Sequence, residues 1–230
     1  MKIAKLEPSQ HKQGRWLVWL EDGSFLRVGE GDVVALCLYE GKDLEEQEAA
    51  ALTAAAEHSK LNERAVELLS ARAMSRKELV DKLTTPPHRR KKTRDSEEEP
   101  DRESLALQQE ALHEAAATVA DRMERLGLIN DGEYGRSVAR HYSAKGFGVR
   151  KIRDELYRRG VPREYWEDAL SELSDMEDGG GSRLDELVRK KLGGAEPTRE
   201  NLKKVSDYLA RRGFGWEEIS TALEHYRMEE

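Results

Sequence analysis

The sequence predicts a mainly α-helical protein, in which three tandem three-helix-bundle repeats follow a small N-terminal β-hairpin element. Three observations support this fold class. The chain has 230 residues, of which 37% are charged and only 6% aromatic, and this composition favours short amphipathic helices with large solvated faces over one deep core. A pattern typical of a tight joint between two helices occurs three times along the chain. An Asp-Gly pair between apolar segments near the N-terminus indicates a hairpin.

The β-hairpin element comes first, and we place it in residues 1–43 together with a short helix. Strands are expected over residues 2–7, 15–20 and 25–28. The turn before the last strand contains Asp22 and Gly23, residue types that suit a tight β-turn. Residues 31–39 are predicted to form the short helix, which we expect to end at Gly41.

Cysteine content and hydropathy indicate a cytoplasmic protein. The single cysteine, Cys37, excludes an internal disulfide framework and fits a reducing compartment. It lies in the apolar run 33–38, so we expect it to be buried as a small hydrophobic residue. The sequence contains no apolar run of about 18 residues that could span a bilayer, and its N-terminus lacks the apolar core of a signal peptide.

The three joints share an apolar residue before a helix, a small residue at the cap and an apolar residue in the first turns of that helix. The copies are Met74, Ser75 and Leu79; Phe147, Gly148 and Ile152; and Phe214, Gly215 and Ile219. The spacing is that of a hydrophobic staple, which fixes the angle at which the chain enters a helix. We therefore assign these residues a structural role, and we expect Phe147 and Phe214 to be buried.

The joints divide the helical part of the chain into three repeats, over residues 44–127, 128–177 and 183–230. The first repeat has a long leading helix over residues 44–69. It contains an insertion at 84–104, where a pair of adjacent prolines, a basic run and an acidic run predict a flexible segment. Helix is expected to resume near Ser104, and the third helix of this repeat is expected over residues 115–126. In the second repeat, Asn130 is a candidate N-cap, with Glu133 completing a capping box.

Candidate catalytic chemistry is absent from the sequence. The six histidines are scattered without metal-ligand spacing. The Gly-Phe-Gly triplets at 146–148 and 213–215 stand between helices, which favours a capping role over phosphate binding. Asp154 and Glu155 lie among arginines, and we interpret them as part of a solvated ion-pair face. We therefore expect a binding protein, with no cofactor, metal or enzymatic activity.

Two stretches carry a resemblance to a known family. Residues 68–83 read LLSARAMSRKELVDKL, and residues 126–161 read LGLINDGEYGRSVARHYSAKGFGVRKIRDELYRRGV. Both resemble hallmarks of the RecX family, bacterial regulators of the RecA recombinase, and the resemblance extends over nearly the whole chain. The insertion at 84–104 departs from the family pattern, which has only a few residues there.

The resemblance implies tandem three-helix repeats and a regulator that binds RecA filaments on DNA and restrains them in recombination and the DNA damage response. It also implies a possible weak direct binding to DNA. We expect a monomer that has no membrane association. The competing interpretation is a stand-alone DNA-binding protein of helix-turn-helix-like geometry, although the net charge of −7 does not favour it.

The second helix of the second repeat carries the candidate contact with RecA or DNA. The residues are Arg150, Lys151, Arg153, Arg158 and Arg159. Arg150 and Lys151 stand at the start of this helix, where the helix dipole disfavours cations by about 0.3–1 kcal/mol. The other two joints place Glu78 and Glu218 at the position of Lys151. A local cost present in one copy of three indicates a use elsewhere, namely contact with an acidic or phosphate-bearing partner.

Overall fold

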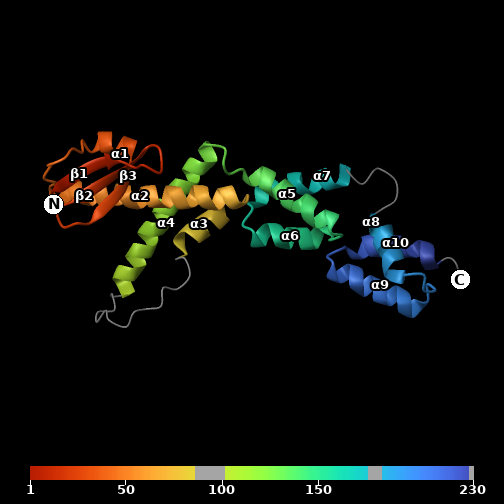
Figure 1. Ribbon diagram of the computed structural model, residues 1–230. Coiled ribbons are helices and arrows are strands. Elements are labelled where there is room, and N and C mark those ends of the chain that lie inside the picture. Colours follow the sequence, from red (N-terminus) through yellow and green to blue (C-terminus); the bar gives the residue numbers. More distant parts are fainter. Residues whose placement is uncertain (86–101, 176–182, 228–230) are drawn as a thin grey trace. The chain divides into compact units, whose positions relative to one another are not determined.

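The computed structural model describes residues 1–85, 102–175 and 183–227 (Figure 1). These residues form three strands, ten α-helices and one short 3-10 helix, so the mainly helical fold class is confirmed. They belong to two compact units. The first unit comprises Met1–Arg72 and Leu79–Leu126, and the second comprises Ala73–Glu78 and Gly127–Glu230. Most of the predicted insertion and the predicted glycine linker lie outside the described residues.

An antiparallel sheet opens the first unit, with its strands in the order β1-β2-β3. The strands are β1 (Ile3–Pro8), β2 (Arg15–Leu20) and β3 (Phe25–Gly29). Their inward-facing side chains Ile3, Val18 and Val28 are fully buried, because a later helix, α2 (Glu46–Ala71), covers one face of the sheet. The chain therefore forms a three-stranded sheet whose last two strands are joined by the predicted hairpin turn.

Two helices follow the sheet, and the first is shorter than predicted. Helix α1 (Glu30–Ala35) ends before Cys37, which has a φ of +48° and is exposed. The expectation that Cys37 is buried is therefore wrong. The left-handed backbone at Cys37 ends the helix and directs the cysteine side chain away from the core. The next residue, Leu38, is buried in the core instead. Helix α2 (Glu46–Ala71) runs without a break and packs on β3 through Leu52.

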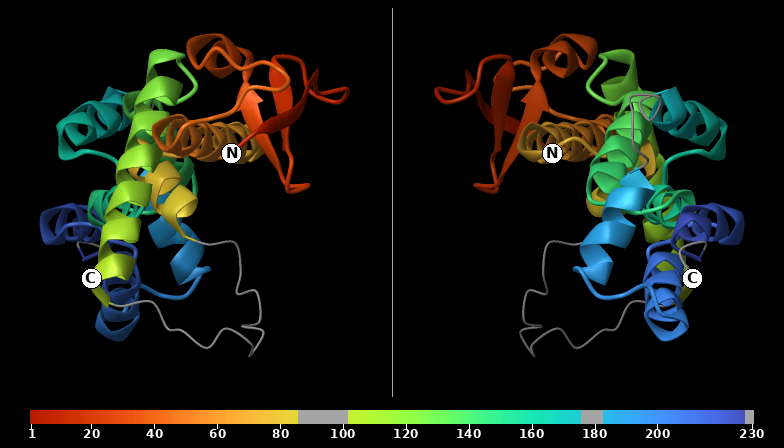
Figure 2. Two further views of the ribbon diagram at one scale, coloured as in Figure 1. Left: turned by 90° about the vertical axis from the view of Figure 1, so that its left-hand side faces the viewer. Right: turned by 90° about the vertical axis from the view of Figure 1, so that its right-hand side faces the viewer.

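The first bundle is completed by α3 (Arg76–Thr84) and α4 (Arg102–Arg125). Helix α4 packs on α2 (Figure 2). Its second half is buried at Ala116, Val119 and Met123. Sequence reasoning expected helix to resume near Ser104 and the third helix of the bundle to start at residue 115, whereas the structure has one continuous helix from Arg102. The predicted start marks where side-chain burial begins, since the preceding turns of α4 are exposed.

The second bundle consists of α5 (Asp131–Ala144), α6 (Val149–Arg158) and α7 (Trp166–Asp175), with a 3-10 turn, η1 (Arg163–Tyr165), before α7. Asn130 caps α5, accepting a hydrogen bond from the Glu133 amide at 2.9 Å. The Glu133 carboxylate binds Arg136 at 2.6 Å. The core is formed by apolar side chains from all three helices, including Val138, Ile152, Leu156 and Ala169.

The third bundle consists of α8 (Arg183–Leu192), α9 (Arg199–Arg211) and α10 (Trp216–Arg227). Its core contains Val188, Val205, Leu209 and Leu223. The joint at 214–215 lies between the second and third helices of this bundle, whereas the joint at 147–148 lies between the first and second helices of the preceding one. The third joint is therefore shifted by one helix relative to the second.

Candidate protein-interaction face on α6

Helix α6 is fixed at its N-terminal end by the end of α9. Gly148, the N-cap of α6, donates a backbone hydrogen bond to the Arg212 carbonyl oxygen at 2.9 Å, and the Arg150 amide donates to the Gly213 carbonyl oxygen at 3.1 Å. The approach is close enough that a Cβ atom on Gly148 would lie 2.5 Å from the Gly213 carbonyl oxygen. Only glycine fits at this contact.

The C-terminal end of α6 is fixed in the same way by the start of α3. The Ser75 hydroxyl donates to the Arg159 carbonyl oxygen at 2.5 Å and accepts a hydrogen bond from the Glu78 amide at 3.0 Å. Arg159 precedes Gly160, which has a φ of +69° and contacts the side chain of Lys77. The same contact therefore occurs at both ends of α6. In each, the residue at the start of one helix (Ser75 or Gly148) donates a hydrogen bond to the carbonyl oxygen of an arginine that precedes a left-handed glycine.

With both ends fixed, α6 buries one face and exposes the other. Ile152 and Leu156 are 1% and 0% exposed. The opposite side presents four exposed residues, which we call the α6 outer face: Arg150, Arg153, Asp154 and Tyr157. The spacing i, i+3, i+4 and i+7 places them in one stripe. The Tyr157 side chain is 72% exposed, which is unusual for an aromatic residue that has a core available beside it.

Glu155 lies on the buried side of α6 and binds three cations. It is only 4% exposed. Its carboxylate lies 2.6 Å from Arg158, 3.9 Å from Lys151 and 3.9 Å from Arg159. Burial raises the pKa of Glu155, but hydrogen bonds from Arg158 and Tyr142 and the charges of Arg158 and Lys151 outweigh this effect, so its pKa lies below the ordinary value. Asp154 is exposed, as expected of a solvated position, whereas the same expectation is wrong for Glu155.

Arg159 is part of the packing between helices. Its guanidinium donates to the Tyr134 hydroxyl at 2.9 Å and lies 5.8 Å from the centre of the Tyr142 ring. Hydrogen bonds to Tyr142 and Tyr134 raise the pKa of Arg159 above the ordinary arginine value. The structure thus separates the five candidate cations into two groups. Lys151, Arg158 and Arg159 have partners within the chain, whereas no described residue forms an ion pair or side-chain hydrogen bond with Arg150 or Arg153.

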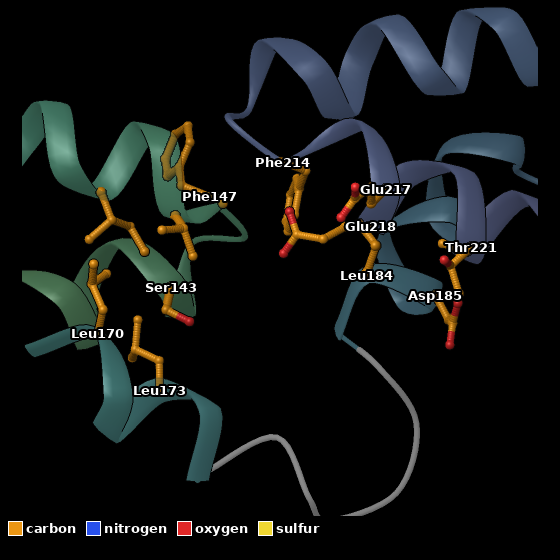
Figure 3. A pocket seen from close by; sticks show the side chains of 14 residues that line it. Ser143, Phe147, Leu170, Leu173, Leu184, Asp185, Phe214, Glu217, Glu218 and Thr221 are labelled. Atoms are coloured by element: carbon orange, nitrogen blue, oxygen red, sulfur yellow. The ribbon is translucent and has the colours of Figure 1, made fainter. Parts of the chain in front are cut away.

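The residues assigned to the joints differ in burial. Met74, Ser75, Leu79, Ile152 and Ile219 are at most 2% exposed. Gly148 is buried and Gly215 is half-buried. Phe147 and Phe214 are only partly buried, so the expectation that both rings lie inside is wrong. Figure 3 shows the reason, since both rings line a cavity of about 500 Å³ that opens between the second and third bundles.

The cavity offers no evident chemistry. Apolar side chains such as Leu170, Leu173 and Leu184 meet the carboxylates of Asp185, Glu217 and Glu218 around it (Figure 3). The Glu218 carboxylate accepts the Gly215 amide, capping α10. Within the described ranges, no three histidine, cysteine, aspartate or glutamate side chains are grouped to hold a metal ion. Nor does any described helix have the length and apolar character needed to cross a membrane.

Comparisons with known proteins identify the family. Residues 130–170 match the model of the RecX second three-helix domain, and residues 182–223 match that of the RecX third three-helix domain. The regulatory protein RecX of Serratia proteamaculans is 33% identical over 160 residues, which cover 69% of this chain and 92% of the relative. The chain belongs to the RecX family. Regulatory protein RecX of Streptococcus sanguinis is 25% identical over 231 residues, covering the whole chain and 79% of that protein.

Solved RecX structures share the fold. A crystal structure of regulatory protein RecX covers 98% of each chain with a TM-score of 0.66 at 23% identity. RecX from Lactobacillus salivarius covers 75% of this chain and 97% of its own, with a TM-score of 0.55 at 22% identity. The two RecX domain matches coincide with helices α5–α7 and α8–α10, so α6 and α9 are both second helices of their domains.

Sequence reasoning missed Glu155 and Tyr157. On a helical projection Glu155 falls between the buried Ile152 and Leu156, so the helical period could have shown its burial. Tyr157 falls opposite these residues. The exposure of Tyr157 was not predicted, because aromatic side chains are usually assigned to a core.

Proposed function

We propose that this RecX-family chain binds filaments of the RecA recombinase on DNA and restrains their assembly, and that the α6 outer face makes the contact. Membership of a family of regulatory proteins supports the regulatory role. The single observation that supports the position of the contact is the exposure of Arg150, Arg153 and Tyr157 on a helix fixed at both ends.

The chemistry of the outer face suits recognition of a protein. Arginine and tyrosine are the side chains most often found to dominate binding energy at interfaces, together with tryptophan. Among the described residues, none forms an ion pair with Arg150 or Arg153. A carboxylate on a filament can therefore bind these arginines without breaking an existing ion pair. Since α6 is held by hydrogen bonds at both ends, little further ordering entropy is lost when it binds.

Several weak contacts can add up in a protein of linked helical bundles. If a second bundle also reaches the same filament, the linkage converts its binding into an intramolecular event. A modest affinity at each face is then sufficient, which is consistent with a contact of two arginines and one tyrosine. A regulator of this kind would compete with the addition of RecA subunits or hold the filament in one state.

Binding to DNA without RecA is the alternative that the same residues allow. Arginines contact phosphates, and an exposed tyrosine can stack on an unpaired base. Asp154 in the same stripe disfavours a polyanion, because it places a negative charge beside the two arginines. This difference makes the two functions separable by experiment.

The test is co-sedimentation of the chain with RecA filaments assembled on single-stranded DNA with a non-hydrolysable ATP analogue. RecA without DNA and DNA without RecA form the two control arms, and each arm is titrated with salt. We expect retention by filaments at physiological salt and little by DNA alone. Equal retention by DNA alone, lost steeply as salt rises, would replace RecA with DNA as the partner.

A further inference from the structure

The cavity between the second and third bundles has two chemically different walls, and Figure 3 shows the two bundles on opposite sides of it. The wall from the second bundle has no charged side chain, and its apolar side chains Phe147, Leu170 and Leu173 are only partly buried. The wall from the third bundle carries every charged residue of the lining, which are Asp185, Glu217 and Glu218. Apolar surface and negative charge therefore share one opening of about 500 Å³.

The negative charge of this cavity is not compensated within the described ranges, where no residue forms an ion pair with any of the three carboxylates. The two arginines beside the cavity have other partners and are not part of its lining. Arg183 donates to the Ser143 hydroxyl, and Arg212 donates to the carbonyl oxygens of Lys145 and Gly146. A cation brought by an occupant would therefore meet carboxylates without an existing ion pair.

An occupant that suits both walls needs apolar and basic side chains in one segment. The segments outside the described residues do not have this combination. Residues 176–182 read MEDGGGS and residues 228–230 read MEE, so neither contains a lysine or an arginine. Residues 86–101 read PPHRRKKTRDSEEEPD, in which the only apolar side chains are prolines.

We propose that this cavity binds a basic amphipathic segment of a RecA subunit. Its apolar side chains would pack on Phe147, Leu170 and Leu173, and its lysines or arginines would pair with the carboxylates of the third bundle. An amphipathic helix in an apolar groove is a recurrent mode of peptide recognition. The complementarity is specific, because a purely basic segment would leave the apolar wall unfilled and an acidic one would be repelled.

This inference rests on the proposed function and adds a second contact to it. Gly148 and Val149 line the cavity and stand at the start of α6. The α6 outer face begins at the next residue, Arg150, so the two surfaces are adjacent within the second unit. They are opposite in charge, since the outer face offers arginines to a filament and the cavity offers carboxylates.

Photo-cross-linking on the full chain identifies the occupant. Benzoylphenylalanine replaces Thr221, an exposed residue that lines the cavity, and the chain is bound to RecA filaments on single-stranded DNA. We expect cross-links to RecA that mass spectrometry maps to a segment with both basic and apolar residues. The same group at Lys203, which is exposed outside the cavity lining, is the control and should give few. Cross-links confined to the chain itself would show that another part of it fills the cavity, and would overturn the proposal.

Neutralising the acidic wall separates this inference from the proposed function. Asp185→Asn/Glu217→Gln removes two charges, and Glu218 is kept because it caps α10. We expect a loss of filament affinity of about three- to tenfold, which shrinks as salt rises. Glu186→Gln/Glu224→Gln changes exposed carboxylates of the same two helices outside the lining and should bind like the parent. Unchanged affinity of Asp185→Asn/Glu217→Gln would overturn the cavity contact and leave the proposed function standing, whereas filaments that fail to retain the parent chain would overturn both.

Discussion

The amide of Gly148 donates a hydrogen bond to the carbonyl oxygen of Arg212, 2.9 Å away, and joins the start of α6 to the end of α9. The Ser75 hydroxyl makes the corresponding bond to the carbonyl oxygen of Arg159. The acceptor in both cases precedes a left-handed glycine, Gly213 or Gly160. Successive second helices are thus joined by one repeated contact, which fixes α6 and presents its outer face.

Gly148→Ala should destabilise the contact between α6 and α9 by about 1–3 kcal/mol, as expected for an inserted methyl group without space. The backbone at Gly148 has a φ of −80° and tolerates alanine, so the cost comes from the clash with the Gly213 carbonyl alone. Urea unfolding measures it. Gly31→Ala is the control, because a Cβ atom there meets nothing within 4 Å. Equal stability of the two variants would show that the close approach is not present in solution.

Ser75→Ala should cost more than the loss of an ordinary helix cap, which is about 1 kcal/mol. The Ser75 hydroxyl caps α3 and also binds the Arg159 carbonyl, so its removal takes a hydrogen bond from each of two backbone groups. Thr198→Ala provides the comparison, since Thr198 accepts only the cap bond from the Asn201 amide among the described contacts. Thermal unfolding that ranks Thr198→Ala as the more damaging change would contradict the joint role of Ser75.

Glu155→Gln should lower stability at neutral pH by about 1–2 kcal/mol, because charged hydrogen bonds to partly hydrated partners are lost. The pKa of Glu155 is below the ordinary 4.5, so its ionised form stabilises the fold above that pH. This stability is lost as the pH falls through the lowered pKa. The difference between variant and parent should therefore shrink below pH 4.5 in urea unfolding. A constant difference down to about pH 2 would show that the charge of Glu155 is not involved.

Most of the secondary structure could be predicted from the sequence, because each element has local signals. Asn130 and Gly146 mark the ends of α5, and the spacing of Ile152 and Leu156 identifies the buried side of α6. The start of α4 at Arg102 agrees with the expectation that helix resumes near Ser104, whereas the expected start of a separate third helix at residue 115 marks only where burial begins.

The contacts between bundles could not be predicted, because they join residues far apart in sequence through backbone atoms. Nothing in the local pattern links Gly148 to Arg212. The signal that could have helped is the Arg-Arg-Gly triplet, which occurs at 158–160 and again at 211–213. Nor could the sequence distinguish Arg150, which forms no side-chain ion pair with any residue that the structure describes, from Lys151, which pairs with the buried Glu155.

Tyr157→Ala should weaken binding to RecA filaments at least tenfold, about 1.4 kcal/mol, while leaving the fold intact. The side chain is 72% exposed and contributes little to the core. Because its contribution to binding is largely apolar, the loss should be the same at low and high salt. Fluorescence anisotropy on labelled filaments measures it, and an unchanged affinity would remove Tyr157 from the interface.

The most direct measurement of the central claim is the affinity of Arg150→Glu/Arg153→Glu for RecA filaments at physiological salt. Lys151 is left in place, because its ion pair with Glu155 supports the fold. Arg199→Glu/Lys203→Glu, which reverses two exposed charges on α9, is the control of equal net charge. We predict at least a tenfold loss for the α6 variant, with a melting temperature within a few degrees of the parent and the control near parental affinity. Full binding by the α6 variant, or an equal loss in the control, would contradict the assignment of the contact to the α6 outer face.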